Sequence, residues 1–195
     1  MPTKRADSEA AKARILDAAR RVLTTDPGAA ATIDQIAAAA GCAKGLVHYH
    51  FKTKDALLGE VATQLWATRA HAWREALSRP EAGDALDTAW KLLRSEAADG
   101  SLTASASLGL SRSIMAGRSV RNGRAGLVRA LTDGLVHLLG HMHRSATVPP
   151  SEVAALLAAL IDGLGLQLAS GEKADQLESA WSAFWAAVLS LTRPG

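Results

Sequence analysis

The chain has 195 residues, of which 48% are hydrophobic and only 4% aromatic, and its formal net charge is +3. This length allows one large domain, or a small domain followed by a larger one, and the hydrophobic content is sufficient for a buried core. The single cysteine, Cys42, excludes an intrachain disulfide. We expect a cytoplasmic protein, because the N-terminus is too polar for a signal peptide and the apolar run at 179–192 is too short to span a bilayer.

Positive charge is concentrated near the N-terminus. Residues 1–54 hold nine Lys and Arg against five Asp and Glu, whereas the rest of the chain is close to neutral. A local basic excess is typical of a nucleic-acid-binding surface, although a solvated basic face has the same composition. The sequence motif within this segment is therefore needed to distinguish a nucleic-acid-binding surface from a solvated basic face.

The hydrophobic spacing predicts an all-α chain of about nine helices. Residues 1–7 form a polar arm that either lies against DNA or is disordered. The first helix is expected over about 8–25, and Asp26-Pro27-Gly28 ends it.

Residues 32–55, TIDQIAAAAGCAKGLVHYHFKTKD, predict two short helices joined by a tight turn. Thr32 and Gln35 have the spacing of a capping box at the start of the first helix. Ala37 and Ala40 are small enough for a second helix to cross closely, and Gly41 can adopt the positive φ that the turn requires. This is the pattern of a helix-turn-helix that reads the major groove of DNA.

The second short helix has two distinct faces. Val47 and Phe51 are expected to point inward and to complete a small core with Cys42. A corner that served packing alone would not need the basic and polar side chains that remain on the outside. The predicted DNA-binding residues are Thr32, Lys44, Gly45, Leu46, His48, Tyr49, His50, Lys52 and Lys54.

The remaining elements are also predicted to be helical. Thr53 is expected to cap a long helix that ends near residue 78, and further helices are expected over about 84–99 and 102–116. Three glycines and three arginines in 117–126 indicate a mobile joint, with Asn122-Gly123 as a turn signal. The last three helices are expected up to about 144, over 151–170 and over 173–192.

Residues 10–61 resemble the TetR family of one-component transcriptional regulators. The similarity lies in AKARILDAARRVL, in the TIxxIAxxAG and KGxxxYxF runs, and in the KxKxxLL exit. Two positions depart from the family pattern, since Leu46 stands where a small hydroxyl residue is common and His48 where a tyrosine is usual. Leu46 could contact a thymine methyl group instead of donating a hydrogen bond.

The resemblance implies a DNA-binding domain over 1–54 and a larger ligand-binding and dimerisation domain over 55–195. It implies a ligand-responsive regulator, a repressor that binds a near-palindromic operator as a homodimer and is released by a small-molecule effector. The dimer would form through the last two helices, with Leu156, Leu160, Leu164, Leu168, Trp181 and Trp185 at the interface. The middle helices would hold an apolar or aromatic effector, lined by Trp66, Trp73, Trp90, Leu93, Met115, Leu131 and His137, although such residues can equally form ordinary core.

Other functional classes receive less support from the sequence. We expect no enzymatic activity and no cofactor, because no metalloprotease helix, catalytic triad or phosphate loop is visible. His137 and His141 lie four residues apart, so a metal-sensing regulator is one alternative. A helical ligand-carrier or scaffold protein without specific DNA binding is another.

Overall fold

The computed structural model describes residues 4–25, 31–110 and 112–195, and this part of the chain is all-α apart from two three-residue strands. The predicted fold class is therefore confirmed. The chain divides into two compact units, the first comprising residues 1–65 and 103–122 and the second residues 66–102 and 123–195. The predicted helix stop at residues 26–28 lies outside the described residues.

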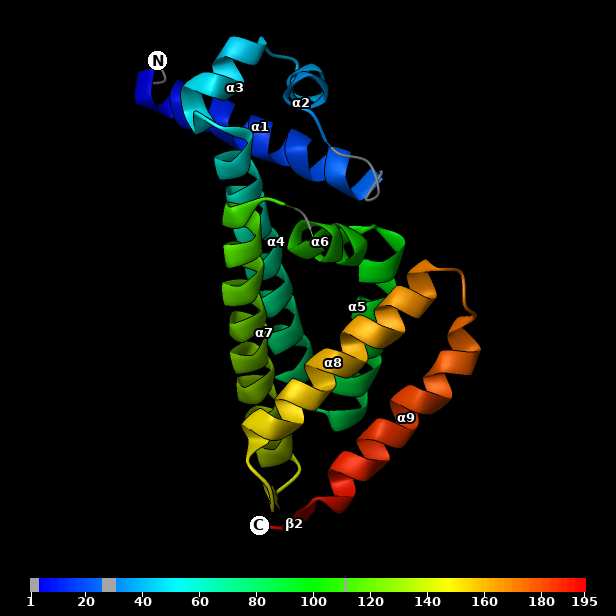
Figure 1. Ribbon diagram of the computed structural model, residues 1–195. Coiled ribbons are helices and arrows are strands. Elements are labelled where there is room, and N and C mark those ends of the chain that lie inside the picture. Colours follow the sequence, from blue (N-terminus) through cyan, green and yellow to red (C-terminus); the bar gives the residue numbers. More distant parts are fainter. Residues whose placement is uncertain (1–3, 26–30, 111) are drawn as a thin grey trace. The chain divides into compact units, whose positions relative to one another are not determined.

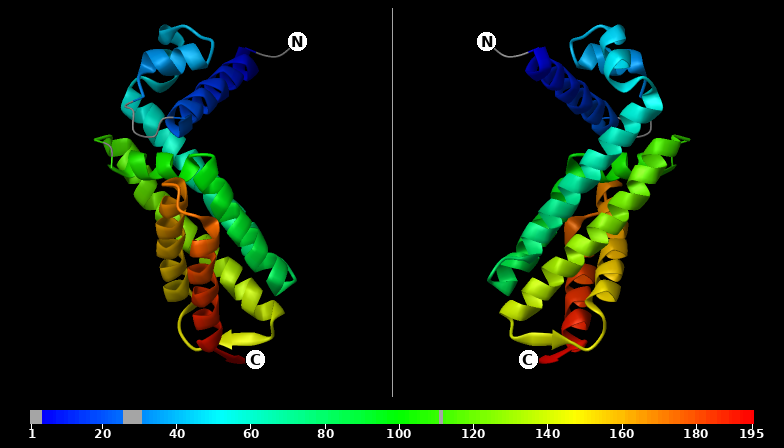
Figure 2. Two further views of the ribbon diagram at one scale, coloured as in Figure 1. Left: turned by 90° about the vertical axis from the view of Figure 1, so that its right-hand side faces the viewer. Right: turned by 90° about the vertical axis from the view of Figure 1, so that its left-hand side faces the viewer.

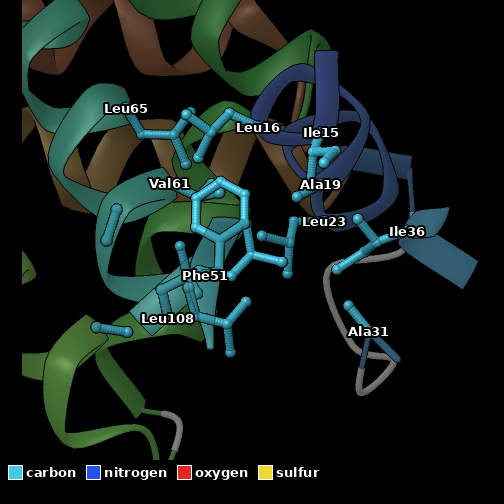
Figure 3. Packing of buried hydrophobic residues seen from close by; sticks show 14 of the residues in the cluster. Ile15, Leu16, Ala19, Leu23, Ala31, Ile36, Phe51, Val61, Leu65 and Leu108 are labelled. Carbon is cyan, nitrogen blue, oxygen red and sulfur yellow. The ribbon is translucent and has the colours of Figure 1, made fainter. Parts of the chain in front are cut away.

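The first unit contains α1 (Lys4–Thr25), α2 (Ile33–Ala39) and α3 (Lys44–Phe51), which pack on one another (Figure 1). It also contains the beginning of α4 (Lys54–Leu77), most of α6 (Ser101–Leu110) and the beginning of α7 (Ile114–His141). These elements share one hydrophobic cluster, in which Phe51 lies centrally with Leu16 and Val61 beside it (Figure 3). The short helices α2 and α3 are thereby held by tertiary packing, since isolated helices of this length are unstable in water.

The connection between α2 and α3 has the geometry that the sequence predicts. Thr32 caps α2 and forms a capping box with Gln35, whose backbone N–H lies 3.2 Å from the Thr32 hydroxyl. Gly41 has a φ of +61°, a conformation that glycine adopts without steric cost. The hydroxyl of Thr53 accepts a hydrogen bond from the Ala56 N–H at 3.0 Å and so caps α4, as expected.

Within the first unit, the start of α4 is fastened to the start of α7. The Asp55 carboxylate accepts a hydrogen bond from the Ser113 hydroxyl and lies 3.3 Å from the backbone nitrogen of Met115. A carboxylate at this position also complements the partial positive charge of a helix N-terminus. Further along the two helices, the hydroxyls of Thr63 and Ser119 are hydrogen-bonded at 2.9 Å.

The second unit contains α5 (Ala82–Ala98), α8 (Pro150–Ala169) and α9 (Ala174–Ser190), together with the later parts of α4 and α7. The strands β1 (Arg144–Ala146) and β2 (Thr192–Pro194) pair antiparallel, with Ser145 opposite Arg193 (Figure 2). Helix α5 packs along α8, and four tryptophans gather in the core. Trp181 has its ring centroid 6.4 Å from Trp73, 5.7 Å from Trp90 and 5.6 Å from Trp185.

Three sequence predictions about local structure are wrong. Residues 4–7 belong to α1 and do not form an irregular arm. The helix expected over 102–116 ends at Leu110, and α7 starts at Ile114. Most clearly, the segment 117–126 is not a mobile joint but part of the uninterrupted helix α7 (Figure 1). The two short strands were not predicted at all.

The reason for the third error is visible at Gly123. A Cβ atom at this position would overlap the Cβ and Cγ atoms of Trp66. The glycine therefore allows α7 to lie directly against α4, and its role is close helix packing instead of backbone freedom. A glycine-rich segment gives the same sequence signal in both cases.

Helix α8 satisfies the length and composition criteria for a membrane-spanning helix, a weak indication that a core helix also satisfies. One face of α8 is buried in the second unit, through residues such as Leu157 and Ile161. The helix also carries Asp162, which is ion-paired to two arginines of the same unit. Both observations are typical of a core helix.

Candidate nucleic-acid interface and effector site

The exposed face of α3 carries most of the predicted DNA-binding residues. Val47 and Phe51 are 1% and 4% exposed and anchor the helix, as expected. Lys44, Gly45, His48 and Tyr49 are exposed on the other side, and Tyr49 is 66% exposed. The structure therefore brings a cation, a bare backbone position and two polar aromatic rings onto one helical surface.

Gly45 has no packing role in the part of the chain that the structure describes. A Cβ atom at this position would meet no other atom within 4 Å. Glycine inside a helix costs roughly 1 kcal/mol relative to alanine, so a helix gains nothing from it in isolation. The open space above Gly45 is where another molecule could approach the backbone of α3 closely.

Lys44 forms an ion pair that the sequence analysis missed. Its Nζ lies 2.9 Å from a carboxylate oxygen of Asp34, in the first turn of α2. Both side chains are largely exposed, so the pair is accessible to solvent and to a competing anion. Asp34 and Lys44 are ten residues apart and lie on different helices, so no local sequence pattern indicates the contact.

The remaining candidates differ in exposure. Leu46 is half-buried and packs against the hydrophobic cluster of the first unit, so only part of it is available to a ligand. His50 is also half-buried, with its ring 5.1 Å from that of Tyr49. Lys52 is exposed, has a φ of +59°, and places its Nζ 5.5 Å from the Tyr49 ring centroid.

Two candidates lie at helix starts. The Thr32 hydroxyl is exposed but engaged in the capping box at the start of α2. Lys54 is the first residue of α4 and is half-buried. Both residues belong to the first unit, Thr32 before α3 in the sequence and Lys54 after it.

The predicted effector-lining residues do not form one group. Trp66, Trp73, Trp90, Leu93 and Leu131 are buried in the second unit, where Trp73 and Trp90 belong to the aromatic cluster around Trp181. Met115 is 41% exposed and belongs to the first unit. His137 is exposed and lines a surface groove of about 440 Å³ with Arg74, Glu75, Ser78, Asp133 and Val136.

A buried polar cluster in the second unit was missed by sequence analysis. The Nε of Arg69 lies 3.1 and 3.0 Å from the two carboxylate oxygens of Glu96, and its Nη1 lies 2.9 Å from Asp162. Arg124 binds the second oxygen of Asp162 at 2.6 Å, and the Trp73 indole N–H donates to Glu96 at 3.0 Å. The one available signal was Asp162, a single carboxylate within the apolar run 153–166.

Burial affects the ionisation of Glu96, one member of this cluster. Arg69 and Glu96 are 7% and 6% exposed. Burial raises the pKa of the Glu96 carboxyl above its ordinary value, and the neighbouring Arg69 guanidinium and Trp73 indole oppose this increase. Among the described residues, no group of three His, Cys, Asp or Glu side chains could hold a metal ion.

The residues predicted for a dimer interface fall into two sets. Leu164, Trp181 and Trp185 are buried in the core of the second unit itself. Leu156 is 63% exposed, whereas Leu160 and Leu168 are half-buried. The surface that α8 presents to solvent also includes Ala155, Ala159, Gly163 and Leu166.

A helix-turn-helix with an exposed basic second helix, joined to a larger helical unit, defines a DNA-binding transcriptional regulator. Residues 15–61 match the family model described as bacterial regulatory proteins, tetR family. The N-terminal segment of the chain is therefore similar to the TetR family of transcriptional regulators. A comparison with curated proteins found no significant match.

Solved structures share the whole fold at low sequence identity. A regulator assigned to the TetR family from Mesorhizobium loti is similar with a TM-score of 0.78 at 19% identity, over 98% of this chain and 99% of that one. A transcriptional regulator from Rhodococcus sp. gives 0.75 at 22% identity, over 93% and 97%. A TetR transcription regulator from Haloarcula marismortui gives 0.72 at 19%, over 95% and 100%. At these identities the likeness establishes the fold.

Proposed function

We propose that this protein is a cytoplasmic, ligand-responsive repressor that binds a near-palindromic operator as a homodimer and leaves it when a small-molecule effector binds. The observation that carries the proposal is the exposed surface of α3, where Lys44, His48 and Tyr49 surround the open position at Gly45. The protein is expected to act by binding alone, without catalysis.

The residues of this surface have separate roles in the proposal. Lys44, Gly45, Leu46 and His48 approach base edges, with Gly45 allowing the helix backbone close to the groove. Side chains at the periphery fix the position of the helix by contacts to phosphates, which carry no sequence information themselves. The phosphate-binding set is Thr32, Tyr49, His50, Lys52 and Lys54.

Dimerisation follows from the size of the reading helix. The eight-residue α3 reads few bases, so two copies on half-sites about 34–36 Å apart are needed for useful specificity. We propose that the exposed faces of α8 and α9 form the interface. On α8, Leu156 and Leu166 flank the small residues Ala159 and Gly163, a combination that permits a close helix contact and buries exposed apolar surface.

On this basis, the domain over 1–54 binds DNA and the chain over 55–195 binds the effector and the partner subunit. The effector would select the conformation in which the two reading helices no longer match the operator. A shift of the population from 1:99 to 99:1 requires about 5.5 kcal/mol of differential binding. The effector must therefore interact much more strongly with one conformation than with the other.

The proposal is tested by selecting genomic fragments from the source organism with purified protein. We expect enrichment of a near-palindromic site by the wild type and its loss in Tyr49→Ala. Tyr49 is 66% exposed, so the substitution should leave the thermal unfolding transition unchanged and isolate the effect on DNA. Binding that is sensitive to salt but blind to sequence would refute the proposal and favour a ligand carrier or scaffold.

A further inference from the structure

Two buried hydrogen-bond donors without partners lie side by side in the second unit. They are Nη2 of Arg69 and Nε1 of Trp66, and the structure gives neither a hydrogen-bond acceptor. The two residues are three apart on α4 and therefore share one face of the helix. The Arg69 guanidinium carbon lies 5.3 Å from the Trp66 ring centroid, so the two groups are neighbours.

The other two nitrogens of the Arg69 guanidinium each have a carboxylate partner. The Nε of Arg69 is bound to Glu96 and its Nη1 to Asp162, which fixes the plane of the group. Because the guanidinium is rigid, the direction of Nη2 is set by these contacts. Buried donors without acceptors are rare in folded proteins and costly, so each needs an explanation, such as a water molecule, an ion or a functional role.

The charges of the cluster indicate what kind of acceptor fits. Arg69 and Arg124 carry two positive charges, and Glu96 and Asp162 carry two negative charges when ionised. A ligand carboxylate would add an uncompensated negative charge to this buried group, which is unfavourable. An uncharged oxygen, such as the carbonyl of a ketone, ester or amide, fills the site without changing the charge balance.

The surroundings indicate the rest of the ligand. The other large buried side chains that α4, α5 and α8 contribute to the second unit are apolar or aromatic, including Trp73, Leu93 and Ile161. Ligand sites of this composition take apolar molecules and use a few polar groups to orient them.

We propose that Arg69 and Trp66 bind the effector by donating hydrogen bonds from Nη2 and Nε1 to one uncharged carbonyl oxygen of an otherwise apolar molecule. The proposal rests on the proposed function, because it names the chemical class of the effector. It also explains how α4, the helix that follows the DNA-binding segment directly, takes part in ligand binding.

The test uses pairs of probes that differ only in the acceptor. Suitable pairs are 2-acetylnaphthalene with 2-ethylnaphthalene and 1-tetralone with tetralin, and 2-naphthoate serves as a charged analogue. The full-length protein is labelled with ¹⁵N at the indole nitrogens, so its five tryptophans give five signals, which Trp→Phe variants assign. We expect at least one ketone to shift the Trp66 signal and to bind about tenfold more tightly than its hydrocarbon.

Two variants and one matched control locate the donors. Trp66→Phe removes Nε1 but keeps an aromatic ring, and Arg69→Lys keeps the charge that Glu96 and Asp162 require but lacks the second planar donor. Both should weaken ketone binding by about two- to tenfold. Trp185→Phe is the control, because its Nε1 is also buried without a partner but its ring packs against Trp181 and Phe184.

Several results would overturn the proposal. They are a Trp66 signal that no ketone shifts, hydrocarbons that bind as tightly as ketones, equal losses in Trp66→Phe and Trp185→Phe, or tighter binding of 2-naphthoate. Release of the operator is measured separately by fluorescence anisotropy. A ketone that binds as expected but leaves operator affinity unchanged would refute effector-driven release and leave the binding site intact.

Discussion

The ion pair between Lys44 and Asp34 leads to a specific prediction about DNA affinity. In the free protein, the Asp34 carboxylate holds the Lys44 ammonium at 2.9 Å. Lysine must leave this partner, or share it, in order to contact DNA, and the carboxylate itself repels the DNA backbone. Asp34→Asn should therefore increase the affinity of the protein for DNA.

The expected magnitude follows from exposure. The two side chains are 53% and 71% exposed, and exposed ion pairs contribute about 0.2–1 kcal/mol. In Asp34→Asn the ion pair no longer has to be broken when the protein binds DNA. The affinity of the variant for DNA should therefore exceed that of the wild type by about 1.4- to 5-fold, since 1.4 kcal/mol corresponds to a factor of ten. Stability should fall by roughly 0.5–2 kcal/mol, because Asp34 also lies in the first turn of α2, where a negative charge is favourable.

The measurement is fluorescence anisotropy with the selected operator and with a generic duplex, together with urea unfolding. Asp84→Asn is the matched control, because it removes an exposed carboxylate from the first turn of α5 in the second unit. A double-mutant cycle with Lys44→Gln should abolish the gain. Unchanged or weaker DNA binding by Asp34→Asn would refute the reasoning and indicate that the pair orients Lys44 for its role.

Four further predictions concern single positions. Gly45→Ala should raise stability by about 0.5–1 kcal/mol in thermal unfolding, because the space is open in the free chain, but weaken operator binding. Lys54→Ala should weaken binding to all sequences alike and reduce the salt slope by about one in affinity measurements at several salt concentrations. Leu156→Glu should convert the dimer into a monomer in sedimentation velocity, because it places charge on an exposed apolar surface. The stability of Glu96→Gln relative to the wild type should increase as the pH rises from below 4.5 to neutrality. Urea unfolding at each pH measures this difference.

The sign of the Glu96 prediction follows from its raised pKa. The folded protein holds the Glu96 proton more tightly than the unfolded chain does. The resulting stabilisation is complete at pH values below the pKa of Glu96 in the unfolded chain, and it is lost as the pH rises through the pKa of Glu96 in the folded protein. Glutamine carries no such proton, so a stability difference that is constant with pH would contradict the assignment.

Each of the other three predictions has a contrary result, and the dimer prediction also has a control. If Gly45→Ala binds the operator as tightly as the wild type does, the backbone of α3 does not approach the DNA closely at this position. An unchanged salt slope would remove Lys54 from the phosphate-binding set. For the dimer, Leu110→Glu is the control, because Leu110 is 89% exposed but lies in the first unit. A dimeric Leu156→Glu would place the interface elsewhere.

The sequence was sufficient where local rules decide the structure. The capping box at Thr32, the turn at Gly41 and the inward positions of Val47 and Phe51 all depend on neighbours within a few residues. The exposed face of α3 followed from these three features. For the same reason, the family resemblance was carried by this segment alone.

The sequence was insufficient where partners lie far apart along the chain. Arg69 meets Glu96 across 27 positions and Asp162 across 93, and no local pattern specifies either contact. The same limitation explains Gly123, whose meaning depends on Trp66 of another helix. It also explains why Trp181 and Trp185 were assigned to an interface although they are buried within the second unit.

The distribution of aromatic side chains gives each unit its own spectroscopic reporter. The only tyrosine of the chain, Tyr49, lies on the exposed surface of α3 in the first unit, whereas all five tryptophans belong to the second. A fluorinated tyrosine would therefore give a single ¹⁹F resonance at the α3 surface. Indole fluorescence from the same sample would report only on the second unit. DNA contact and small-molecule binding can thus be recorded in one tube, and the order in which the two events occur can be timed without attaching a dye or mutating the chain.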